Sequence, residues 1–227
     1  GGGRYNLDSA PAVTNCTFSG NSAAFDGGGM YNDGDSCAPV VRNCTFSGNS
    51  VTSAGSGMFN SDGVPTVANC IFWGNTGGQN IVNNSATPIV TYSVVQNGYV
   101  GGTYIVSGDP NLGPLADNGG PTKTHALTSG STAIDAGITF DASVISTDQR
   151  GVARPQGVSF DIGSYEYWEK QILTVTTTGN GSAAPSPLGV VVGTTGTCWG
   201  YDNETPVILT ASEDARSVFV SWGGDAS

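Results

Sequence analysis

The stretch NCTFSGN at residues 15–21 recurs unchanged at 43–49, and a near copy, NCIFWGN, occupies residues 69–75. The copies begin at 15, 43 and 69, so the intervals are 28 and 26 residues. Short apolar pieces precede each copy at a similar spacing, separated by Gly, Asn, Asp and Ser, and helical periodicity is absent. A repeat of this length predicts a solenoid, in which each coil buries its apolar side chains only by stacking on the next.

The alternation within the repeated stretch predicts which side chains fill the core. Side chains two residues apart on a strand point to the same face, so one pair points inward and Thr17 between them points outward. Stacking then aligns a cysteine ladder and a phenylalanine ladder: Cys16, Cys44, Cys70, and Phe18, Phe46, Phe72. Because parallel crossovers strongly favour one hand, we expect an all-β, right-handed parallel β-helix with three short strands per coil.

The asparagine that opens each copy is expected to turn the chain. Asn tolerates a positive φ better than other residues with a side chain, which suits Asn15, Asn43 and Asn69 to a bend between strands. We also expect their stacked side chains to hydrogen-bond from coil to coil.

Composition excludes several kinds of partner. The chain has 7 Lys and Arg against 18 Asp and Glu, a net charge of -11. Nucleic acids and anionic membrane surfaces require basic side chains, so neither is expected to bind. No apolar run approaches the roughly 20 residues of a membrane-spanning helix. Because the chain starts within the repeat, we expect a piece of a larger protein whose other segments stack on the open first coil.

Motifs in residues 1–168 resemble those of bacterial surface proteins. FSGN at 18–21 and 46–49 and FWGN at 72–75 match the FxxN motif of chlamydia-type polymorphic outer membrane proteins. Four further motifs resemble the choice-of-anchor Q region: DPNLGPLADNGGPTKTHAL (109–127), STAIDAG (131–137), DQRGVARP (148–155) and DIGSYEY (161–167). The resemblance implies β-helix coils over 1–108 and a terminal capping region over 109–168, at the bacterial cell surface or secreted.

Residues 172–227 follow a different pattern, alternating and rich in β-branched residues. They are similar to a divergent internalin-type B-repeat, which implies a small β module that is incomplete at its C-terminal end. The positions that match are Leu173, Val175, Gly179, Gly181, Val207, Leu209, Thr210, Ala211, Phe219, Trp222, Gly223 and Asp225.

Few residues offer catalytic chemistry. Glycoside hydrolysis needs paired carboxylates, and polysaccharide lysis needs a basic residue beside acids that bind Ca²⁺. Residues 1–108 contain only Arg4 and Arg42 as basic residues, and their acids do not recur in register. His125 is the single histidine and is expected to be structural. We therefore expect no enzyme activity.

A cofactor is not expected either, although Asp33 and Asp35 resemble a fragment of a calcium loop and form a weak Ca²⁺ candidate. The ladder cysteines are expected to be buried thiols. The two remaining cysteines, Cys37 and Cys198, would pair only if the second module folded back on the β-helix.

Charged residues concentrate near the end of the region 109–168. Arg150 and Arg154 lie among four acids: Asp135, Asp148, Asp161 and Glu166. We expect one or more Arg–Asp pairs to lock the final coils and to cap the solenoid against edge-to-edge association.

Together these features predict a non-enzymatic structural or adhesive part of a secreted or cell-surface bacterial protein. Its faces would contact glycans, matrix proteins or other proteins through weak multivalent interactions. Two alternatives stay open: a carbohydrate-active β-helix enzyme whose catalytic coils lie upstream of residue 1, and a self-assembling extracellular filament subunit.

Overall fold

The computed structural model describes residues 1–139, 145–169, 171–175, 182–186, 190–191, 198–201 and 207–212. The chain divides into two compact units, Gly1–Tyr167 and Trp168–Ser227. The described residues form β-strands, turns and irregular segments, and none of them is helical. Accordingly, no helix within these ranges is long and apolar enough to cross a membrane.

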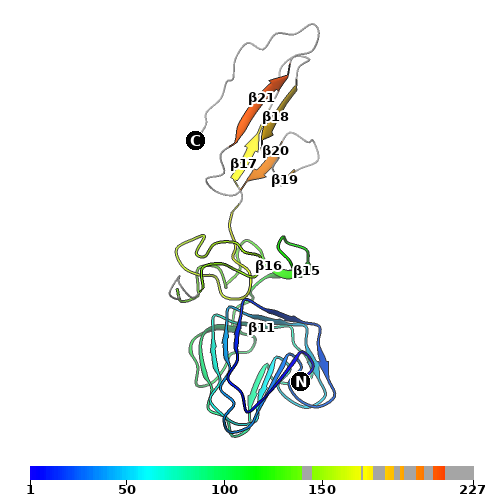
Figure 1. Ribbon diagram of the computed structural model, residues 1–227, viewed down its shortest axis with the longest axis vertical. Helices are drawn as coiled ribbons and strands as arrows, with labels where there is room; N and C mark the ends of the chain where they lie inside the picture. Colours follow the sequence, from blue (N-terminus) through cyan, green and yellow to red (C-terminus); the bar gives the residue numbers. More distant parts are fainter. Residues whose placement is uncertain are drawn as a thin grey trace. The chain divides into compact units, whose positions relative to one another are not determined.

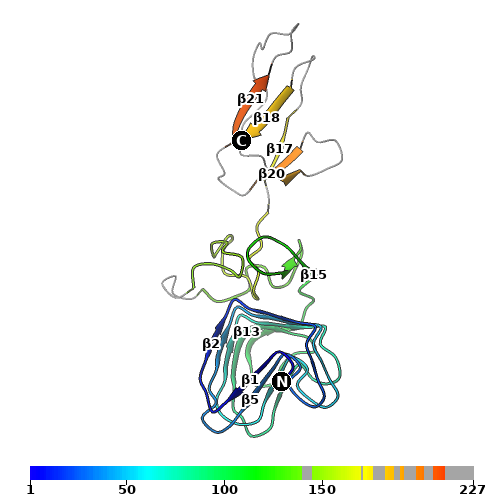
Figure 2. The same cartoon turned by 45° about the vertical axis from the view of Figure 1, so that its right-hand side comes forward.

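The first unit is a parallel β-helix of about four coils, which confirms the predicted fold class (Figures 1 and 2). Its strands are β1 (Arg4–Leu7), β2 (Ala12–Thr14) and β3 (Thr17–Ser19), then β5 (Met30–Asp33), β6 (Val40–Arg42) and β7 (Thr45–Ser47). The third coil has β9 (Met58–Asn60), β10 (Thr66–Ala68) and β11 (Ile71–Trp73), and β12 (Ile81–Asn83), β13 (Ile89–Val95) and β14 (Thr103–Val106) follow. The first two coils each have a fourth strand of two residues, β4 (Ser22–Ala23) and β8 (Ser50–Val51). The sequence did not predict this fourth strand.

Identical residues stack through the core because the repeat keeps the strands in register. Phe18 pairs with Phe46, and Phe46 with Phe72, in the parallel ladder of β3, β7 and β11. Their ring centroids are 4.7 and 4.6 Å apart with nearly parallel planes. These rings share one apolar core with Cys44 and Cys70. The repeated stretch therefore supplies the interior of the β-helix.

The asparagine that opens each copy does adopt a left-handed backbone. The φ angles of Asn15, Asn43 and Asn69 are 53°, 48° and 51°. In the last coils Tyr92 and Tyr104 take this place, with φ of 45° and 55° and their rings 4.5 Å apart. A bend of this geometry between the second and third strand of each coil sets the triangular course of the chain.

The coil-to-coil bonds expected at these three asparagines are not formed, and that prediction was wrong. Asn15 donates to the carbonyl of Thr147, and Asn69 donates to and accepts from the backbone of Ile138. The buried amide of Asn43 has no hydrogen-bond partner among the described residues. A side chain at a left-handed bend projects sideways from the coil, so it faces the flank rather than the next coil.

Two other columns of asparagines do bond from coil to coil. Within each column an amide donates to the amide oxygen of the next asparagine, at 2.7–2.9 Å, and the last asparagine of each column donates instead to a group outside the column. The first column lies within β1, β5, β9 and β12, and the second starts at the asparagines of the FxxN motif and ends at Asn80: Asn6, Asn32, Asn60, Asn83, and Asn21, Asn49, Asn75, Asn80. These ladders satisfy polar groups that would otherwise be costly inside a stack of coils.

Residues 109–167, here called the lateral segment, contain the antiparallel pair β15 (Leu112–Ala116) and β16 (Thr124–Leu127). The segment lies alongside the coils in both views (Figures 1 and 2). Thr17 bonds to Gln149 at 2.7 Å, and Thr45 accepts from the backbone of Ser164 at 3.0 Å. The capping prediction was therefore wrong, because the segment binds a flank across successive coils instead of covering their end.

The second unit is an antiparallel β module. One sheet has the order β17 (Gln171–Thr174), β20 (Cys198–Tyr201) and β19 (Val190–Val191), and β18 (Ser182–Ser186) pairs with β21 (Ile208–Ser212). Of the positions that match the B-repeat pattern, six lie outside the described residues: Gly179, Gly181, Phe219, Trp222, Gly223 and Asp225.

Candidate functional site

A buried ion pair stands at the centre of the lateral segment. The guanidinium of Arg154 lies 2.6 Å from the carboxylate of Glu166, and both side chains are fully buried. Arg154 also donates to the carbonyls of Asp161 and Gly163, at 2.9 and 2.7 Å. Glu166 accepts from the backbone N–H groups of Gln156 and Asp161. Because these bonds tie residues 154–166 together around one charge pair, the pair acts as the internal clasp of this part of the segment.

Arg150 forms the predicted Arg–Asp pair, with Asp148, at 2.6 Å. The carboxylate of Asp148 also accepts from the backbone of Val152 and Glu166, and Arg150 donates to the carbonyl of Glu166. The ring of Tyr165 lies 3.5 Å beneath the guanidinium of Arg150. This second pair therefore closes a tight loop and is not open to a ligand.

The carboxylates of Asp135 and Asp161 bond to backbone instead of to arginine. Asp161 accepts from the N–H groups of Asp135 and Tyr167, and Asp135 accepts from that of Ser159. Burial raises the pKa of Asp161 to about 6 and that of Glu166 to about 7. Burial likewise lowers the pKa of Arg154, although the nearby acids oppose this shift. All four acids of the predicted group thus hold the fold together.

His125 also has a structural role. Its Nδ1 lies 2.8 Å from the carbonyl oxygen of Gly113, which can only accept, so Nδ1 carries the proton. The other ring nitrogen, Nε2, lies 2.9 Å from the hydroxyl of Ser19, from which it accepts when the imidazole is neutral. The histidine joins β16 to the first coil and is engaged through both nitrogens.

The flank under the lateral segment was missed by the sequence analysis. The outward positions of β3, β7 and β11 are Thr17, Thr45 and Ile71, and Thr45 and Ile71 are almost fully buried. Ile71 packs with residues of the lateral segment in a second apolar core, and Trp73 packs against it. The sequence does contain a signal that this flank is covered. The third copy of the repeat, NCIFWGN, has Ile and Trp at the outward positions where the first two copies have Thr and Ser.

The cysteines offer no reactive thiol among the described side chains. Cys37, Cys44 and Cys70 are buried free thiols, and Cys16 is partly exposed. Burial raises the pKa of Cys44, while the bond to Cys44 raises that of Cys16. The side chain of Cys198 lies outside the described part of the chain.

The calcium candidate is a solvent-facing corner at the end of β5. The carboxylate of Asp33 accepts from the hydroxyl of Tyr5 at 2.7 Å, and Asp35 is exposed in the following turn. Within the described ranges, no three or more His, Cys, Asp or Glu residues come together in a way that could hold a metal ion.

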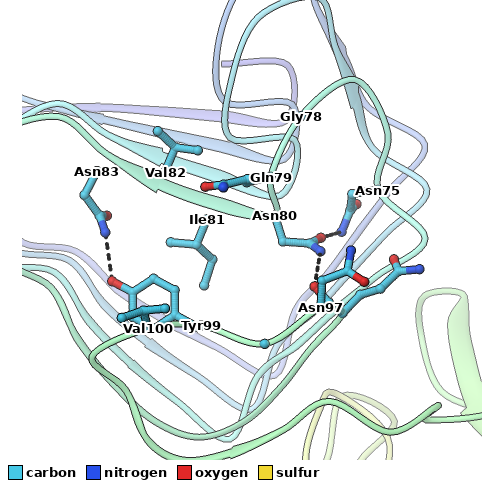
Figure 3. A pocket seen from close by; sticks show the side chains of 12 residues that line it. Asn75, Gly78, Gln79, Asn80, Ile81, Val82, Asn83, Asn97, Tyr99 and Val100 are labelled. Carbon is cyan, nitrogen blue, oxygen red and sulfur yellow. Dashed lines mark hydrogen bonds between the residues drawn. The ribbon is translucent and has the colours of Figure 1, made fainter.

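The last full coil leaves a pocket at the end of the β-helix. The strand β12 is the last in its sheet. After β13 the chain runs alongside β12 through residues 96–100 without joining that sheet (Figure 3). Two side-chain bonds join the segments: Asn80 donates to the carbonyl of Gln96 at 3.2 Å, and Asn83 donates to the hydroxyl of Tyr99 at 2.8 Å. The gap between them is a pocket of about 500 Å³.

This end pocket is lined by amides and by an aromatic ring. The lining comprises Asn75, Gly78, Gln79, Asn80, Ile81, Val82, Asn83, Gln96, Asn97, Gly98, Tyr99 and Val100. None of these residues is charged at neutral pH. Such a lining can donate and accept hydrogen bonds, but it contains no carboxylate, histidine, lysine or cysteine, which leaves Tyr99 as its single side chain of the kinds that transfer protons or attack as nucleophiles.

Comparison with known proteins supports the architecture. A family model described as a right handed beta helix region matches residues 1–145, which is more than half of the chain. No curated protein and no solved structure gives a significant match to this chain.

Proposed function

The chain belongs to the right-handed β-helix family, and we propose that it is a non-enzymatic, adhesive and structural segment of a secreted or cell-surface bacterial protein. Its task would be to hold a rigid surface at a distance and to contact glycans through that surface. The resemblance to the choice-of-anchor Q region and to the internalin-type B-repeat supports the extracellular location.

The observation that carries this proposal is the chemistry of the end pocket. A pocket lined by neutral amides and a tyrosine suits the binding of hydroxyl groups, whereas hydrolysis of polysaccharides needs a pair of carboxylates at the reacting bond, which this lining does not supply. The buried acids of the lateral segment accept bonds from backbone and arginine, so they serve the fold.

Rigidity favours the structural part of the proposal. Phenylalanine rings, asparagine amides and parallel strands all continue from coil to coil in one register. The lateral segment adds a second apolar core along one flank. Such a body keeps its outer surface in a fixed geometry, which lowers the entropy that a multivalent contact must lose.

Binding and cleavage should be measured together on the same polysaccharides. The full chain is incubated with insoluble neutral polysaccharides and with polygalacturonate, and co-sedimentation and release of new reducing or unsaturated ends are recorded. We expect retention on a neutral polysaccharide without any new ends. Appearance of new ends that scales with protein concentration would contradict the proposal and favour a carbohydrate-active enzyme.

A further inference from the structure

We infer that the end pocket between β12 and residues 96–100 binds a single residue of a neutral saccharide. This inference rests on the proposed function and assigns its ligand class and its site. Four properties of the pocket carry it: free hydrogen-bonding groups, neutrality, an apolar wall, and closure at both ends.

Several polar groups of the pocket have bonding capacity that the described residues do not use. Gln79 and Asn97 are exposed, and neither side chain forms a hydrogen bond within the described part. The hydroxyl of Tyr99 accepts from Asn83, so its own proton is available to a ligand. Gln96 accepts from the backbone of Gly74 through Oε1, which leaves its NH₂ group free to donate. Sugar hydroxyls both donate and accept, so they match this mixture.

The lining also decides against a charged ligand. None of its side chains carries a charge, so a uronate, a phosphate or an amino sugar would lose its hydration without gaining an opposite charge. The side chain of Val100 and the ring of Tyr99 offer contact for the C–H groups of a pyranose (Figure 3). Val100 is 99% exposed, which is unusual for valine and places an apolar side chain at the rim.

An extended peptide is the other ligand that the edge of β12 suggests, since an edge strand can pair with a further strand. Such a strand would have to run past both ends of β12. The bonds of Asn80 to Gln96 and of Asn83 to Tyr99 close the gap at those two places, as Figure 3 shows. The volume of about 500 Å³ lies within the range of small-molecule sites, about 300–1,000 Å³. A compact ligand therefore fits better than a strand.

Titration of the full chain with methyl glycosides of neutral hexoses and N-acetylhexosamines, followed by NMR, tests the inference. The variants are Gln79→Ala and Asn97→Gly. The glycine retains the positive φ of 69° at position 97, so it removes the amide without backbone strain. Each variant should weaken binding about five- to tenfold, the effect of one lost hydrogen bond. Asn84→Ala is the matched control, because Asn84 is exposed, adjacent to β12 and outside the pocket.

The outcomes separate this inference from the proposed function. Unchanged affinity in both pocket variants, the absence of any glycoside binding, or tighter binding of methyl glucuronoside or of an extended peptide would each overturn the pocket assignment. Retention of the wild-type chain on a neutral polysaccharide would still support the proposed function in those cases. Cleavage of a polysaccharide by a chain whose pocket variants lose glycoside binding would overturn the proposed function and leave the site in place.

Discussion

Replacing Arg154 with methionine tests whether the buried ion pair holds the lateral segment on the β-helix. Methionine retains most of the side-chain volume but removes every donor. Three bonds are lost, to the carbonyls of Asp161 and Gly163 and to the carboxylate of Glu166. The carboxylate would then be buried without its cation, since the side chain of Glu166 is 0% exposed.

Removal of one partner from a buried ion pair costs about 3–5 kcal/mol, because the remaining charge has lost both its water and its counter-ion. Domains of this size are stable by only about 5–15 kcal/mol, so the variant should lose a large share of its stability. In the double variant Arg154→Met with Glu166→Gln, no buried charge remains at the pair. We expect the double variant to regain about 2 kcal/mol relative to Arg154→Met alone.

Urea unfolding followed by tryptophan fluorescence is a suitable assay, because Trp73 packs against the apolar core that joins the lateral segment to the coils. Lys123→Met is the matched control, since Lys123 is exposed and its replacement should change stability by less than about 0.5 kcal/mol. If Arg154→Met were no less stable than this control, the clasp would not hold the segment and the argument would be wrong.

Three further predictions concern the same unit. Folding raises the pKa of Asp161 from 3.8 to about 6 and that of Glu166 from 4.5 to about 7. The folded state therefore binds more protons than the unfolded state in this pH range. Urea unfolding should show the free energy of unfolding falling as pH rises from 3.8 to about 7. The variant Glu166→Gln should show a smaller dependence of this free energy on pH. Thermal unfolding should show that Asn69→Gly costs about 1–2 kcal/mol more than Asn43→Gly, because only Asn69 loses hydrogen bonds to the lateral segment; equal costs would refute this. Phe46→Ala should cost about 3–5 kcal/mol in urea unfolding, since its ring fills the core between two others, and a loss under 1 kcal/mol would contradict the packing.

The core of the β-helix could be predicted because it is periodic. Once Phe18, Phe46 and Phe72 occur at one position of a repeat, parallel stacking places them in contact whatever the rest of the chain does. The left-handed bends at Asn15 and Asn43 follow from local sterics alone. A sequence therefore predicts contacts that recur with the repeat, and it predicts backbone conformations that depend on the type of a single residue.

The hydrogen bonds of the asparagines were harder to predict. Asn69 and Asn75 open and close the same repeated stretch, yet only Asn75 bonds within a coil-to-coil ladder. The difference arises from the direction in which each side chain leaves the coil, and a positive φ turns Asn69 toward the flank. Residue identity shows that an amide is present but not which neighbour it faces.

The sequence by itself determined the repeat, the all-β class and the composition of the core, because each depends on contacts between equivalent positions of successive coils. Only the tertiary structure decided where the lateral segment lies and where the pocket forms. The segment binds a flank through contacts such as that of Thr45 with Ser164, 119 residues apart, which no period relates. The pocket exists where residues 96–100 depart from the repeat. The substitutions at Ile71 and Trp73 mark the covered flank, but the structure was needed to show what covers it.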